Sequence, residues 1–154
     1  MRRLSWWAGV VLLLITAAIA LPNLLRSCCG SNEMDVTRVL RNLNTAMVTY
    51  STTYERGFPD SLLKLAPPPR GRQPNMDRAD LLPDELAAVM ANRFSYRGYR
   101  VAFTPGSGPS IKTYIITAEP LERGKTGQRS FFTDETAVIR SKATTPATAS
   151  DTAM

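Results

Sequence analysis

The first feature of the hydrophobic pattern is a long uncharged stretch near the N-terminus. Residues 4–25 contain no charged side chain, and most of these positions are apolar. At about 1.5 Å rise per residue, a helix over residues 6–25 would be about 30 Å long, which matches the hydrocarbon core of a bilayer. The pattern therefore predicts an N-terminal transmembrane anchor within residues 1–30. The side chains expected to carry the anchor are Trp6, Trp7, Leu13, Ile19, Pro22 and Leu25.

Charges on the two sides of this stretch predict its orientation. Arg2, Arg3 and the terminal amine precede it, whereas Arg26 alone follows it. Because the more positive flank stays in the cytoplasm, we expect a single-pass protein of the inner (cytoplasmic) membrane, with its N-terminus cytoplasmic and its domain outside the cytoplasm. Two alternatives stay open: cleavage of a signal peptide at the Ala-Ile-Ala pattern of residues 18–20, and a lipoprotein with a lipidated Cys28.

A second apolar pattern predicts an amphipathic helix after the break expected at residues 28–30. Residues 31–32 (Ser-Asn) offer N-cap oxygens, and Glu33 and Asp35 place acids in the expected first turn. Apolar side chains then recur at alternating spacings of four and three residues up to the helix end at Gly57, which indicates one buried face. This core stripe consists of Val36, Leu40, Leu43, Met47, Tyr50 and Tyr54.

Strand signals follow a long connection over residues 57–95, in which residues 61–65 and 80–92 could form short helices. The expected strands are residues 96–104, 112–119, 129–133 and 137–140. Tyr99, Val101 and Phe103 share one face of the first strand, and Phe131 or Phe132 is expected in the core. Short connections favour an antiparallel sheet packed against the helix stripe, so the fold class expected for the domain at residues 31–140 is α+β. The tail at residues 141–154 is expected to be disordered, because it is rich in Ser, Thr, Ala and Pro.

Composition argues against several kinds of chemistry. The chain contains no histidine, the usual general base and the commonest metal ligand, so we expect no enzyme, no cofactor and no small-molecule substrate. The formal charge is +6, but three of the arginines flank the apolar stretch and the others are scattered, so we expect no nucleic-acid partner. Asp134 and Glu135 are adjacent acids in an expected hairpin, where they are either solvated or help to bind calcium.

The two cysteines, Cys28 and Cys29, are neighbours. Their Cα atoms are about 3.8 Å apart, below the usual disulfide range, so a bridge between them would be strained. We expect free or interchain thiols close to the membrane. Zinc would need further ligands of the Cys or His type.

Several segments together resemble the type IV pilins and the pseudopilins of type II secretion. The resemblance covers most of residues 10–140, and its N-terminal part is the most specific. The matching segments are residues 17–25 (Ala-Ala-Ile-Ala-Leu-Pro-Asn-Leu-Leu), Asn32-Glu33 and the helix that follows, residues 45–50 and 57–59 with Tyr54, and residues 127–134 and 138–140. It implies a pilin-like fold, in which one long helix has a transmembrane and an amphipathic part and packs on a small antiparallel sheet. It also implies a structural subunit whose partners are the membrane and other pilin-like subunits.

One position departs from the family pattern. The family's glutamate, which lies 17 residues before the proline, falls on Ser5 when the proline is Pro22. In the family this carboxylate neutralises the terminal amine of a neighbouring subunit during assembly. The alternative hypothesis is therefore a monomeric, membrane-anchored accessory or binding module with a pilin-like fold.

Overall fold

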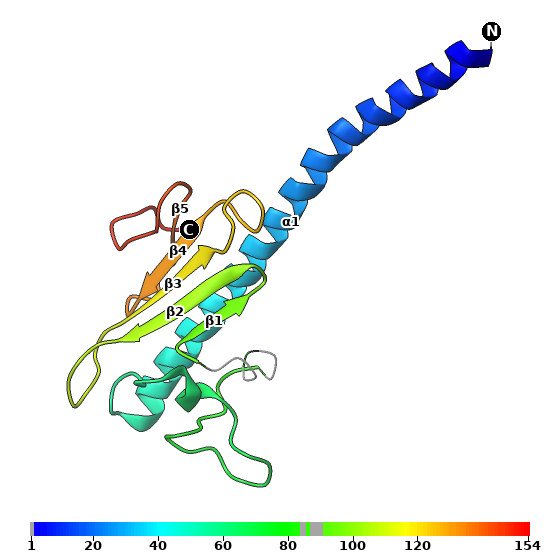
Figure 1. Cartoon of the computed structure of the whole chain (residues 1–154). Coiled ribbons are helices and arrows are strands. Elements are labelled where there is room, and N and C mark those ends of the chain that lie inside the picture. The colour runs from blue at the N-terminus through cyan, green and yellow to red at the C-terminus, as the bar shows by residue number, and fades with distance from the viewer. Residues whose placement is uncertain (1, 84–85, 87–90) are drawn as a thin grey trace.

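The computed structural model describes residues 2–83, 86 and 91–154, apart from the side chains of residues 2–10, 17 and 19–28. Its dominant element is the helix α1, which runs without a break from Arg2 to Tyr54 and projects from the rest of the chain (Figure 1). The expected break at residues 28–30 is wrong, since Gly30 lies inside α1. A glycine in a helix costs only about 1 kcal/mol relative to alanine, which the hydrogen-bonded turns on both sides outweigh.

The second half of the chain forms one antiparallel sheet, in which each strand pairs with its neighbour in sequence. The chain is therefore an α+β protein, as the pattern predicts. Expected strands 112–119 and 129–133 correspond to β3 and β4 with small shifts. The strands are β1 (Arg93–Tyr96), β2 (Tyr99–Pro105), β3 (Tyr114–Pro120), β4 (Ser130–Asp134) and β5 (Arg140–Lys142).

Two of the expected strands differ from the structure. Residues 96–104 are not one strand, because Arg97 and Gly98 turn the chain between β1 and β2 with φ angles of 46° and 75°. Two successive positive φ values fit the twist of a two-residue hairpin. Residues 137–139 are not a strand either, because Ala137 has a φ of 58° and its N–H donates to the carbonyl of Asp134 at 2.8 Å. That turn delays β5 until Arg140.

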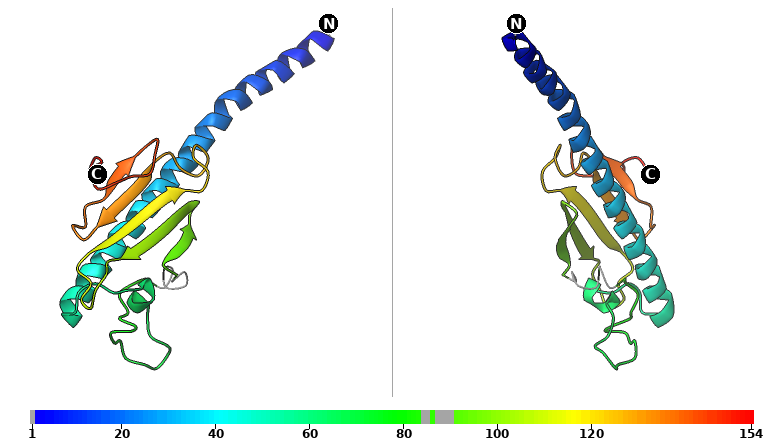
Figure 2. Two further views of the ribbon diagram at one scale, coloured as in Figure 1. Left: turned by 60° about the vertical axis from the view of Figure 1, so that its left-hand side comes forward. Right: turned by 90° about the vertical axis from the view of Figure 1, so that its right-hand side faces the viewer.

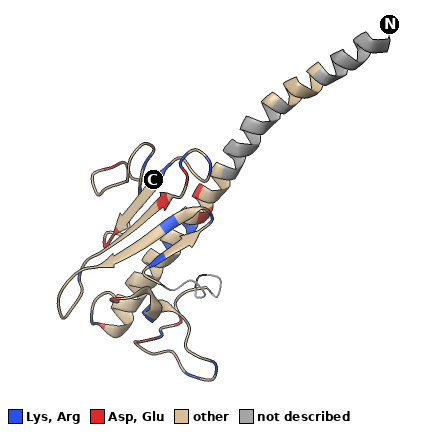
Figure 3. Cartoon of the chain, in the orientation of Figure 1, with Lys and Arg blue, Asp and Glu red and all other residues tan. Residues whose placement is uncertain are grey.

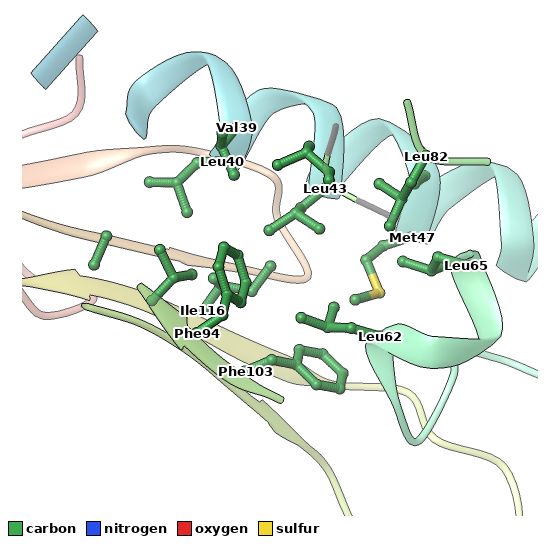
Figure 4. Close-up of a cluster of buried hydrophobic side chains, with 14 of the residues drawn as sticks. Val39, Leu40, Leu43, Met47, Leu62, Leu65, Leu82, Phe94, Phe103 and Ile116 are labelled. Atoms are coloured by element: carbon green, nitrogen blue, oxygen red, sulfur yellow. The ribbon is translucent and has the colours of Figure 1, made fainter. Parts of the chain in front are cut away.

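The hydrophobic core lies between the C-terminal part of α1 and one face of the sheet (Figures 2 and 4). Val36, Leu40, Leu43, Met47 and Tyr50 are buried, while Tyr54 is partly buried against the same cluster. On the sheet side the inward positions of β2 and β3 are buried, together with Phe131 of β4. These inward positions of β2 and β3 are Tyr99, Val101, Phe103, Tyr114, Ile116 and Ala118.

Short elements of the long connection pack against one end of this core. Leu62 and Leu65 are buried in the 3₁₀ helix η1 (Leu62–Leu65), which agrees with the helical turn expected at residues 61–65. The N–H of Ala79 donates to the carbonyl of Lys64 at 2.8 Å, so the returning chain is tied to η1. The helix expected over residues 80–92 is wrong at residues 80–83 and 91–92, which are not helical; Leu86 is helical, and residues 84–85 and 87–90 lie outside the described ranges.

The C-terminal residues are ordered, which corrects the expected disordered tail at residues 141–154. The N–H of Ser141 donates to Thr152 O at 3.0 Å, and the N–H of Met154 donates to Ile139 O at 2.9 Å. An ion pair of 3.0 Å joins Lys142 Nζ to a carboxylate oxygen of Asp151. Backbone and polar contacts thus hold a segment whose apolar content is too low to fold by itself.

Candidate anchoring and assembly helix

Residues 11–15 of α1 expose a continuous apolar surface. Five consecutive side chains are at least half exposed: Val11 52%, Leu12 64%, Leu13 69%, Leu14 62% and Ile15 51%. Successive residues of a helix are about 100° apart, so five of them cover every side of it. A helix that is apolar all round is normally buried in a core or a membrane. The domain does not bury residues 11–15, so we expect another apolar environment to bury them.

Of the six expected anchor residues, only Leu13 has a described side chain. Trp6, Trp7, Ile19, Pro22 and Leu25 lie in the helical backbone of α1, and their side chains are outside the described set. Among the residues whose structure is fully described, no helical segment is both long enough and apolar enough to span a membrane.

Where the projecting helix meets the domain, a group of hydrogen bonds holds it. This helix clamp consists of Cys29, Asn32 and Glu33 on α1, together with residues 122–129 between β3 and β4. Asn32 Nδ2 donates to Thr126 O at 2.9 Å, and Cys29 Sγ donates to Lys125 O at 3.1 Å. Glu33 Oε1 accepts the N–H groups of Gln128 and Arg129 at 2.7 and 3.1 Å.

The clamp gives new roles to residues that the sequence pattern placed in a helix start. Since α1 begins at Arg2, Glu33 and Asp35 cannot act on a helix N-terminus at this point. Glu33 instead fixes a loop, and Asp35 forms ion pairs with Arg38 and, at 3.7 Å, with Arg97 in the β1–β2 turn. Cys29 is a buried thiol without a disulfide partner among the described residues; the side chain of Cys28 is not described.

A buried polar group sets the register of α1 on the sheet. Asn44 is 5% exposed, and its Nδ2 donates to Thr133 Oγ1 at 2.9 Å and to Ala137 O at 3.1 Å. Tyr114 Oη donates to Asn44 Oδ1 at 3.1 Å, and burial raises the pKa of Tyr114, so the hydroxyl keeps its proton. Sequence reasoning missed Asn44, because a single polar residue next to an apolar stripe gives no sign of its partners.

Asp134, the last residue of β4, has a local partner in the β4–β5 turn. Asp134 Oδ1 accepts the N–H of Thr136 at 3.0 Å, which closes an Asx turn. Throughout the described ranges, no group of three or more acidic, Cys or His side chains is placed to hold a metal ion. Asp134 and Glu135 thus have no third acidic partner there, and calcium binding at this turn stays an untested hypothesis.

Comparison of the chain with protein-family models, with curated proteins and with solved structures gives no significant match.

Proposed function

We propose that the chain is a pilin-like or pseudopilin-like structural subunit of a type IV pilus or type II secretion apparatus, which acts by helix packing and not by chemistry. The observation that carries this proposal is the exposed apolar segment at residues 11–15, on a helix whose other half forms the domain core. Such a segment is stable only where lipid chains or other apolar helices cover it. The proposed partners are therefore the membrane and further pilin-like subunits.

The order of elements supports the pilin-like assignment. One uninterrupted helix serves both the apolar segment and the core, and the antiparallel sheet follows it in the chain. The resemblance over residues 10–140 implies the same arrangement. In this proposal the N-terminus lies in the cytoplasm, α1 crosses the inner membrane once, and the sheet lies outside the cytoplasm.

The alternative is a monomeric accessory or binding module anchored in the same way. Ser5 favours it, because a serine cannot supply the charge that the family's glutamate supplies at that position. Both versions require the anchor, and they differ in whether α1 packs against other helices.

We expect the full chain to stay with membranes during alkaline carbonate extraction. Replacing Leu13 and Leu14 by aspartate should release it, because each charge near the middle of a transmembrane helix costs about 2.5–3.5 kcal/mol. The matched control replaces Met34 and Val48, two exposed apolar residues in the domain half of α1, by aspartate. This control carries the same charge and should stay in the pellet.

Recovery of the unaltered chain in the soluble fraction would contradict the anchor. So would equal release of both double variants, because the location of the charge would then be irrelevant. Mass spectrometry of the membrane-bound protein distinguishes the signal-peptide alternative, in which the mature N-terminus would lie near residue 21.

The second test separates the subunit from the monomeric module. A buried terminal amine without a partner is costly in an apolar helix bundle, and a carboxylate one turn into the helix offsets it. We expect Ser5→Glu, expressed behind a cleavable leader in cells with a pilus assembly system, to raise the amount of chain in sheared filaments. Ser5→Gln is the control, because glutamine has nearly the same size as glutamate but no charge. The amount of this variant in sheared filaments should equal that of the unaltered chain. Filaments built from the unaltered chain alone would refute the charge argument.

A further inference from the structure

The strand β1 forms one edge of the sheet, and its outer side offers backbone hydrogen-bonding groups. In the antiparallel register, Tyr96 pairs with Tyr99 across the two-residue turn, and Phe94 pairs with Val101. The N–H of Phe103 donates to Asn92 O at 2.7 Å, which fixes the alternation of hydrogen-bonded pairs. The N–H and C=O groups of Arg93 and Ser95 therefore point away from β2, toward an edge at which none of the described residues pairs with them; this side of β1 is called its free edge.

Basic side chains surround this edge. Arg93 lies in β1, Arg97 in the β1–β2 turn and Arg100 in β2, where basic positions are blue in Figure 3. Arg93 and Arg100 are exposed, and the Arg97 side chain is 64% exposed although it lies 3.7 Å from Asp35. Glu119 is opposite Arg100, but it lies on the β3 side, away from the edge. The three arginines thus stand against the two carboxylates of Asp35 and Glu119, which leaves a net positive charge around the free edge of β1.

A hollow of about 370 Å³ adjoins the same strand and is lined by Arg93, Phe94, Ser95 and Arg100. Phe94 fills the core from the inner face, so the side chains of Arg93 and Ser95 belong to the outer face. A residue of an added strand that points to this outer face would lie beside Arg93. Alternate residues of a strand point to the same face, so carboxylates at every second position of the added strand would lie on the face that carries the arginines and could form ion pairs with them.

We propose that the free edge of β1 binds an extended acidic peptide by strand addition. The backbone of the peptide pairs with Arg93 and Ser95, and its alternate carboxylates face Arg93, Arg97 and Arg100. A peptide fits better than a nucleic acid, because the edge presents carbonyl oxygens as well as N–H groups. Phosphates only accept hydrogen bonds and would leave these carbonyls without partners. This docking site does not include residues 11–15 of α1, the exposed apolar segment that carries the proposed function.

The test measures binding of a fluorescein-labelled peptide of alternating glutamate and valine to the full chain in detergent micelles, by fluorescence anisotropy. The lysine–valine peptide is the charge control. We expect the double variant R93E/R100E to raise the dissociation constant at least about tenfold. The matched control R70E/R72E makes the same change of net charge on the exposed loop of the long connection, and it should bind like the unaltered chain.

Strand pairing is tested separately from charge. Ser95→Pro removes the outward N–H, whereas Ser95→Ala removes only the hydroxyl, so we expect weaker binding for the first and unchanged binding for the second. Strand pairing can also be tested from the peptide, without altering the protein. Two glutamate–valine peptides are compared, one N-methylated on the odd-numbered residues and the other on the even-numbered residues, so that only one of them loses the N–H groups that face β1. That peptide should lose binding and the other should keep it. Equal binding by both N-methylated peptides, equal effects of both arginine double variants, or equally strong competition by an oligothymidylate would overturn the proposal, as would absence of binding.

Discussion

Replacing Leu43 by alanine is expected to lower the free energy of unfolding of the domain by about 2–5 kcal/mol. Leu43 is fully buried in the middle of the helix–sheet core, where it lies between Leu40 and Met47 in Figure 4. The substitution removes three carbon atoms, Cγ and the two Cδ methyl groups, and leaves a cavity that the rigid helix on one side and the sheet on the other cannot close.

Met34→Ala is the matched control for this prediction. Met34 is on the same helix but 71% exposed, and methionine and alanine are both good helix formers, so the change should stay within about 0.5 kcal/mol. Unfolding in urea can be followed by near-UV circular dichroism of the five tyrosines, all of which lie in the domain. Equal midpoints for Leu43→Ala and Met34→Ala would mean that the buried face of α1 is wrongly assigned.

Replacing Gly57 by alanine is expected to lower the free energy of unfolding by about 2–4 kcal/mol. Gly57 has a φ of 85°, which strains any residue with a Cβ. An added Cβ would also lie 2.3 Å from the carbonyl oxygen of Ile111, the oxygen that accepts the N–H of Phe58 at 2.8 Å. The substitution therefore strains the backbone and breaks the link between the end of α1 and the β2–β3 connection.

Gly71→Ala separates these two causes. Gly71 has nearly the same φ, 81°, but nothing lies within 4 Å of its added Cβ. It should show the cost of backbone strain alone, about 1–2 kcal/mol. The same thermal midpoint for both variants would show that the contact with Ile111 contributes nothing.

The helix stripe and the inward face of β2 could be predicted because their apolar periodicity is strong. Spacings of three and four from Val36 to Tyr54, and of two from Tyr99 to Phe103, each specify one buried face. The continuity of α1 through Gly30 could not be predicted, because the local propensity of Cys-Cys-Gly disfavours a helix. The hydrogen bond that Glu33 accepts next to this point comes from Gln128, which is 95 residues away along the chain. Gly98 inside a strand pattern was a readable sign of a turn, although an Arg-Gly pair is an unusual hairpin sequence.

The clamp and the buried contacts of Asn44 could not be predicted from the local sequence pattern. Asn32, Glu33 and Asn44 act through partners 70–96 residues away along the chain, so no local spacing encodes them. The order of the C-terminal tail was missed because composition measures apolar content, whereas Ser141 and Met154 are held by backbone hydrogen bonds. The free edge of β1 exists because the chain turns at Arg97 and Gly98. The prediction of one strand over residues 96–104 does not include this turn.

The uninterrupted course of α1 has a mechanical consequence. A force applied along the N-terminal half would travel down one helix of 53 residues, with no hinge loop to absorb it. It would load the contacts from Val36 to Tyr50 in parallel, as shear along the sheet, so they would have to fail together and not one by one. The rate of forced unfolding is set by the barrier to unfolding. A domain loaded in this direction should withstand larger pulling forces than the same domain pulled through β5, where a strand of three residues can peel away from one end.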